Sequence, residues 1–149
     1  SDANDYFVTW VFSQIQKSKN RFGNLIGISL TNSEWYYVGG NVGIDFRLSI
    51  YDNFTYDDVR KDIQVNLSKY LDFRYWDINK KVEWGELLSI VKQTKGVKYV
   101  PDTVFKPNVD EIVPTNKLPR IKAFKMRDLN GNIIYDSNNI LTPVFYPAN

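Results

Sequence analysis

The chain has 149 residues, of which 43% are hydrophobic and 24% are charged, and its 19 basic and 17 acidic residues leave a formal net charge of +2. This composition predicts one globular domain, or one domain with a small appendage. The chain contains neither Cys nor His, which excludes disulfides, thiol nucleophiles and zinc knuckles and removes the commonest general base. The balanced, scattered charge argues against nucleic acid or an anionic membrane as a partner.

No apolar stretch in the sequence approaches the roughly 20 residues that a membrane-spanning helix requires, and the N-terminus shows no signal-peptide pattern. We therefore expect no membrane insertion. The chain begins with Ser1-Asp2-Ala3 instead of Met. This start favours a piece of a longer polypeptide or a tag remnant.

The first 40 residues predict one helix and two strands. Apolar residues from Phe7 to Ile15 recur at helical spacing, although the β-branched and aromatic run Phe7–Phe12 is also compatible with a strand. A strand is predicted at Leu25–Leu30 and a short aromatic strand at Glu34–Val38. The following glycine-rich run, Gly39–Gly43, leads into a strand and not a helix, so it lacks the geometry of a phosphate-binding loop.

The clearest pattern of the chain begins at Val42 and has a period of two. Apolar residues alternate with polar or aromatic ones as far as Tyr51, which is typical of a strand with one buried and one wet face. Its apolar members are Ile44, Phe46, Leu48 and Ile50. We place Asp45 and Arg47 on the wet face.

Two amphipathic helices are predicted after this strand. Thr55 is a candidate N-cap with Asp58 three residues later, and apolar residues at spacings of three and four carry the first helix to Leu71. The second helix is predicted at Glu83–Thr94. Gly96 closes it, and a short strand at Val97–Val100 ends at Pro101.

The C-terminal third contains prolines and a turn signal. Three prolines recur from Asp102 to Pro119, and we predict that this segment is extended and irregular. Arg120–Asp128 and Ile133–Asp136 are predicted strands, and Asn130-Gly131 between them is a strong hairpin signal. The tail after Ile140 offers Phe145 and Tyr146 to a neighbouring chain.

These elements predict an α+β fold with a mixed or mostly antiparallel sheet, two helices packed on one face of it, and a C-terminal β-hairpin. We divide the chain into an α+β domain at 1–114 and a hairpin with an extended tail at 115–149.

Two carboxylate clusters resemble ligand sites and have simpler explanations. Asp58 and Asp62 on the first helix have a spacing that could serve a metal or an acid–base pair, but the solvated face of a helix explains them better. Acidic and amide residues around the hairpin turn suggest a calcium loop. The turn lacks the glycine and glutamate positions of that motif, and a plain hairpin is favoured.

An aromatic group could form a binding surface. Its members are Trp35, Tyr36, Tyr37, Tyr75, Trp76 and Trp84. Burial in the core is the first interpretation, a protein interface is the second, and a platform for sugars or single-stranded nucleic acid is the third.

Four segments in this order resemble a known family. The strand Asn41–Ile50 leads into the helix Thr55–Leu71, Leu87–Val91 precedes Gly96-Val97, and the segment Asn116–Ile121 is similar to an asparagine-x-leucine-proline motif before that family's last strand. The arrangement resembles the C-terminal region of baseplate J-like proteins, the wedge and ring components of contractile phage tails, and in particular the wedge proteins of T-even-like phages. The likeness covers about Leu25–Asp136.

The family pattern contains no catalytic residues, so the resemblance implies a structural protein that is not an enzyme and needs no cofactor or metal. It implies a place in the tail baseplate of a virion after assembly in the host cytoplasm, with other copies of the chain and baseplate wedge proteins as partners. We predict an interface that includes Trp35, Tyr36, Tyr37, Asp45, Arg47, Trp76, Phe145 and Tyr146. The alternative is a carbohydrate- or host-surface-binding module that uses exposed aromatics.

Overall fold

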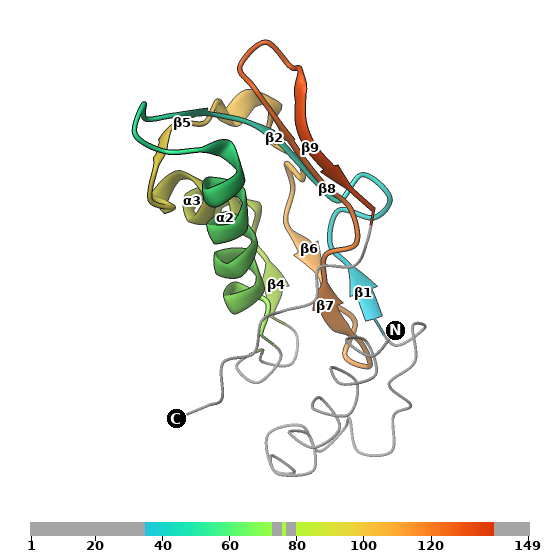
Figure 1. Cartoon of the computed structure of the whole chain (residues 1–149). Helices are drawn as coiled ribbons and strands as arrows, with labels where there is room; N and C mark the ends of the chain where they lie inside the picture. The colour runs from blue at the N-terminus through green and yellow to red at the C-terminus, as the bar shows by residue number, and fades with distance from the viewer. Residues whose placement is uncertain (1–34, 73–75, 77–79, 139–149) are drawn as a thin grey trace, which may run out of the picture.

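The computed structural model of the protein describes residues 35–72, 76 and 80–138 (Figure 1). The elements predicted at Phe7–Ile15 and Leu25–Leu30 lie outside these residues, as do Phe145 and Tyr146. The described elements are β1 (Trp35–Tyr37), β2 (Ile44–Arg47), β3 (Ser49–Ile50), α2 (Tyr56–Tyr70), β4 (Lys81–Val82), α3 (Trp84–Gln93), β5 (Val97–Tyr99), the 3-10 turn η4 (Asp102–Val104), β6 (Glu111–Ile112), β7 (Leu118–Arg120), β8 (Phe124–Arg127) and β9 (Ile133–Ser137).

The predicted α+β class is confirmed, with two helices and short strands of mixed direction. In the part of the chain that the structure describes, the strands form four small sheets. β1 pairs with β7 in parallel, and β2 pairs with β8 in parallel. β9 adds to β8 as the antiparallel arm of the predicted hairpin, which gives the order β2-β8-β9. β3–β5 and β4–β6 are antiparallel pairs.

The two parallel pairs run along the same stretches of chain but contain a length mismatch. Nine residues separate Trp35 from Ile44, whereas six residues separate their register partners Leu118 and Phe124. The first stretch therefore holds three extra residues, and they bulge out in the loop between β1 and β2. Backbone hydrogen bonds close this loop at both ends, from Val38 N–H to the Arg120 carbonyl and from Ile44 N–H to the Ala123 carbonyl, each 2.9 Å.

Glycines permit the tight path of this loop. Gly39 and Gly43 have φ values of +74° and +68°, a region that residues with a side chain rarely adopt. A Cβ atom on Gly43 would lie 2.0 Å from the Ala123 carbonyl oxygen. The approach of β2 to β8 thus explains Gly43, whereas a Cβ on Gly39 would lie 2.2 Å from the Gly43 carbonyl oxygen, within the loop itself.

The helix signals of the sequence are confirmed almost to the residue. The Thr55 side chain caps α2 by accepting a hydrogen bond from the Asp58 N–H at 3.2 Å. α3 begins after Glu83 and ends before Thr94, and Gly96 has a φ of +94°. No helix within the described residues is long and apolar enough to cross a membrane.

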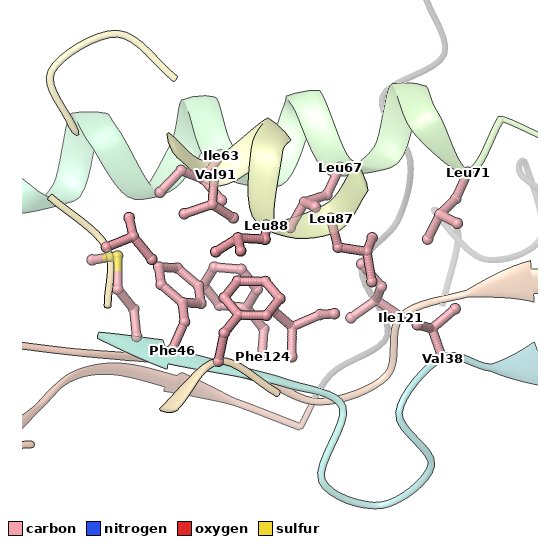
Figure 2. Packing of buried hydrophobic residues seen from close by; sticks show 14 of the residues in the cluster. Val38, Phe46, Ile63, Leu67, Leu71, Leu87, Leu88, Val91, Ile121 and Phe124 are labelled. Atoms are coloured by element: carbon pink, nitrogen blue, oxygen red, sulfur yellow. The ribbon is translucent and has the colours of Figure 1, made fainter. Parts of the chain in front are cut away.

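The core lies between the two helices and the β2–β8 strands (Figure 2). Phe46 and Phe124 point from the strands toward the helices, with ring centroids 5.5 Å apart in an edge-to-face contact. The buried helix residues that meet them are Val59, Ile63 and Leu67 of α2 and Leu87, Leu88 and Val91 of α3. Both helices thus pack on one face of the sheet, as predicted.

Residues on both sides of the proposed division at 114/115 belong to this one core. Val113 and Ile121 are both members of it. β7 and β8, from the C-terminal segment, pair with β1 and β2 from the N-terminal one. The hairpin is therefore built into the main fold and does not form a separate appendage.

The region from Asp102 to Asp128 contains more structure than the sequence indicated. Its prolines do not prevent the short strand β6 and the turn η4. The single strand predicted at Arg120–Asp128 is divided into β7 and β8. The break between β7 and β8 falls beside the β1–β2 loop, where the two stretches of the chain stop pairing residue for residue.

Alanine substitutions at three glycines test this account of the loop. Gly43→Ala should lower the free energy of unfolding by more than about 2 kcal/mol, because a left-handed conformation and a clash with Ala123 combine. Gly40→Ala carries a φ of +59° without any clash and should lose about 1–2 kcal/mol. Gly85→Ala in α3 meets open space and should be neutral or up to about 1 kcal/mol more stable.

Urea unfolding of the three variants measures these differences. Equal losses for Gly43→Ala and Gly40→Ala would contradict the close approach of β2 to β8 as the reason for Gly43.

Candidate interaction surface

The β2–β8–β9 sheet has one apolar face and one charged face. Its buried residues, such as Phe46 and Met126, point toward the helices, and the alternate positions point outward. We name the outward set the charged sheet face, and it consists of Asp45, Arg47, Lys125, Arg127 and Asp136. In the strand register, Asp45, Lys125 and Asp136 form one row across the sheet, and Arg47 lies opposite Arg127 in another. The alternation predicted for Asp45 and Arg47 is confirmed.

A two-pronged ion pair holds the centre of this face. The Arg127 guanidinium donates from Nε to Asp45 Oδ1 at 2.9 Å and from Nη2 to Asp45 Oδ2 at 3.1 Å. Its third nitrogen, Nη1, donates to the Gly131 carbonyl at 3.1 Å. The hydrogen bond to Asp45 raises the pKa of Arg127 above its ordinary value. Arg127 therefore joins β2, β8 and the hairpin turn.

Arg47 is the charge on this face that lacks a counterion. Its guanidinium lies against the turn, where Nη1 donates to the Leu129 carbonyl at 3.4 Å. That is its one hydrogen bond to the described part of the chain, and no carboxylate there pairs with it. By contrast, Lys125 and Asp136 form a longer ion pair of 3.9 Å.

The carboxylate of Asp128 stabilises the hairpin turn by accepting hydrogen bonds from it. Asp128 Oδ1 accepts the backbone N–H groups of Asn130 and Asn132, each at 2.9 Å, and Oδ2 accepts the Asn132 side-chain amide at 3.1 Å. These bonds, the Asn132 backbone first, lower the pKa of Asp128. No group of three or more acidic, His or Cys side chains that could hold a metal occurs in the residues described.

Two large apolar side chains are exposed at the turn end of the charged sheet face. Leu129 in the turn is 43% exposed, and Ile133 of β9 is 53% exposed. Ile133 is the register partner of Arg127, so it lies in the same row as Arg127 and Arg47. An arginine without a counterion beside exposed apolar groups is typical of a protein-binding surface.

The aromatic residues predicted for the interface lie elsewhere, and two of them are core residues. Trp35 and Trp76 are each 4% exposed. The Trp35 ring is covered by the Arg120 guanidinium at 4.4 Å, and Trp76 packs edge-on against Tyr70 at 5.7 Å. Burial removes the faces of both indoles from partners, in keeping with the first interpretation of the aromatic group.

Tyr36 and Tyr37 are half-buried on β1, and Tyr36 takes part in a structural clasp. Its hydroxyl donates to Glu111 Oε1 at 2.8 Å, and the Gly39 N–H donates to the same carboxylate at 3.0 Å. Burial, followed by the hydrogen bond to Glu111, raises the pKa of Tyr36 to about 12. Glu111 thus fastens β6 to the β1–β2 loop.

The acidic residues at the start of α2 remain on its solvated side. Asp57 forms ion pairs with Arg60 and with Lys61, the latter at 3.1 Å, and the hydrogen bond from Arg60 lowers its pKa. Asp58 and Asp62 are exposed. No ion pair to another described residue engages either of them.

Sequence reasoning missed Arg127 and two exposed tyrosines. Arg127 follows the buried Met126 in an alternating run, a signal that could have placed it beside Arg47 if the parallel pairing had been known. Tyr56 begins α2 and Tyr99 ends β5, and both are exposed, as is Tyr51, which the alternation had placed on the wet face.

Comparison with known proteins leaves the family open. No protein-family model matches the chain, and no curated protein matches it.

The Glu111 clasp predicts one abnormal tyrosine titration. The raised pKa means that the Tyr36 hydroxyl keeps its proton below pH 10.0 and loses it as the pH rises through about 12. Ultraviolet difference spectra between the wild type and Tyr36→Phe should isolate this ionisation. In Glu111→Gln its midpoint should move toward 10, and a midpoint near 10 in the wild type would contradict the clasp.

The Asp45–Arg127 pair predicts a specific weakness in the hairpin. Asp45→Asn preserves the size of the side chain but removes its negative charge, which leaves Arg127 and the neighbouring Arg47 without it. Amide hydrogen exchange in β8 and β9 should therefore accelerate more than exchange in α2. Asp136→Asn, which loosens only the longer pair with Lys125, is the matched control and should change exchange less. Equal acceleration in both variants would show that Asp45 has no special role.

Proposed function

We propose that this chain is an assembly domain of a contractile phage tail baseplate. It acts through self-association and through contacts with neighbouring baseplate wedge proteins, and by this proposal it resides in the virion tail. The observation that carries the proposal is the charged sheet face, where Arg47 has no counterion among the described residues and Leu129 and Ile133 are exposed beside it.

The resemblance to baseplate J-like proteins supports this function through scaffold elements. Three of the four segments that carry the likeness include regular elements at the expected places, namely β2 and β3, the Thr55-capped α2, and α3 with Gly96 after it. In the fourth, the Asn116–Ile121 segment, β7 pairs with β1. These segments position a sheet face and do not frame a reaction centre.

The roles of three carboxylates at or near the sheet also favour assembly over catalysis. Asp45 is bound to Arg127, Glu111 to Tyr36 and Gly39, and Asp128 to its own turn. A general acid or base requires a carboxylate that is available to substrate. Each of these carboxylates instead fastens one element of the fold to another.

The alternative, a carbohydrate- or host-surface-binding module, is less well supported because two of the aromatic residues predicted to bind the ligand are buried. Stacking of a sugar requires an accessible ring face, whereas Trp35 and Trp76 are buried. The Tyr36 hydroxyl is bound to Glu111. The assembly function is therefore the better supported of the two.

Sedimentation velocity over a range of protein concentrations tests the proposal. At low ionic strength the weight-average sedimentation coefficient should rise with concentration, because charged faces attract. In 1 M salt, where the Debye length is about 3 Å, the rise should be reduced. The second arm measures binding of the chain to purified wedge proteins of the tail to which it belongs. One unchanging monomer in all conditions, together with no binding to those proteins, would contradict the proposal.

A further inference from the structure

The charged sheet face contains one positive charge more than its own residues neutralise. Asp45 is matched to Arg127 and Asp136 to Lys125, so Arg47 remains. The Arg47 guanidinium is held in place against the turn by the Leu129 carbonyl. A positioned guanidinium can bind a carboxylate through two parallel hydrogen bonds with little loss of side-chain freedom.

α2 contains three acidic and three basic side chains, and two of the acidic ones have no ion pair to the described residues. Asp57 is neutralised by Arg60 and Lys61, whereas Asp58 and Asp62 are exposed one turn apart with no ion pair to the residues described. Two like charges at this spacing repel each other. A cation placed between them would remove that repulsion.

These two surfaces lie on different sides of the core. The apolar stripe of α2 and the apolar face of the β2–β8 strands meet in the core (Figure 2). Asp58 and Asp62 point away from that core on the helix side, and Arg47 points away from it on the sheet side. No ion pair joins Arg47 to Asp58 or Asp62 within one molecule.

We propose that the charged sheet face of one copy binds the exposed side of α2 in a second copy, with Arg47 against Asp58 and Asp62. The inference rests on the proposed function, since it names the surfaces through which the chain self-associates. Half-buried Val65 follows Asp58 and Asp62 on the same side of the helix and faces the exposed Leu129 and Ile133 of the other copy.

This contact is heterologous because it joins two different surfaces. Each copy retains a free sheet face at one end and a free α2 side at the other. Further copies therefore add in the same direction, and they form a ring if the rotation closes or an open chain if it does not.

A charge exchange between two variants tests the contact. Arg47→Glu should raise the dissociation constant for self-association roughly tenfold or more, because like charges then face each other. Asp62→Lys combined with Asp58→Asn, which keeps a polar residue in the first turn of α2, should do the same. Mixing equal amounts of the two variants should restore association, since acidic α2 meets Arg47 and basic α2 meets Glu at position 47.

Sedimentation velocity of each variant and of the mixture, with circular dichroism to verify folding, gives the readout. Lys81→Glu is the matched control, because it changes the net charge equally at an exposed lysine of β4, which belongs to neither proposed surface, and should leave association unchanged. Wild-type association that Arg47→Glu does not weaken, or that the mixture does not restore, overturns this contact and leaves the proposed function in place. A wild type that stays monomeric in every arm counts against both.

Discussion

The structure depends on the parallel pairing of two stretches that lie about eighty residues apart in the chain. β1 and β2 lie beside β7 and β8 in the same order and direction. A parallel pair requires a long crossover, and the intervening chain supplies it with α2 and α3 on one side of the strands. The β1–β2 loop absorbs the mismatch in length between the two stretches. The tight approach at Gly43 explains why glycine occupies this position.

This pairing also creates the charged sheet face. Asp45 and Arg127 are 82 positions apart, and the register of β2 with β8 brings them into a two-pronged ion pair. Arg127 then holds the Gly131 carbonyl, so the same guanidinium fixes the hairpin turn. Arg47 lies opposite Arg127 and finds only a carbonyl. The register of β2 with β8 therefore accounts both for the Asp45–Arg127 ion pair and for the unbalanced charge of Arg47.

The balance of charges within the domain supports a role in assembly. Three carboxylates, those of Asp45, Glu111 and Asp128, are engaged within the fold, as Glu111 holds the β1–β2 loop to β6. Arg47 on the charged sheet face and Asp58 and Asp62 on α2 have no ion pair to the described residues. A domain of this kind can bind further copies in one direction without a change in its own fold. A repeating wedge or ring requires such a contact.

The sequence alone determined the local elements, because their signals are local. Thr55 capped α2, apolar spacing defined both helices, Gly96 followed α3, and Asn130-Gly131 lay within the hairpin turn. The α+β class and the outward position of Asp45 and Arg47 followed from the same patterns. Tertiary structure decided which distant strands pair, because register depends on packing between residues far apart in the chain. It therefore decided that Trp35 and Trp76 are core, that Arg127 neutralises Asp45, and that Arg47 has no counterion within the described part of the chain.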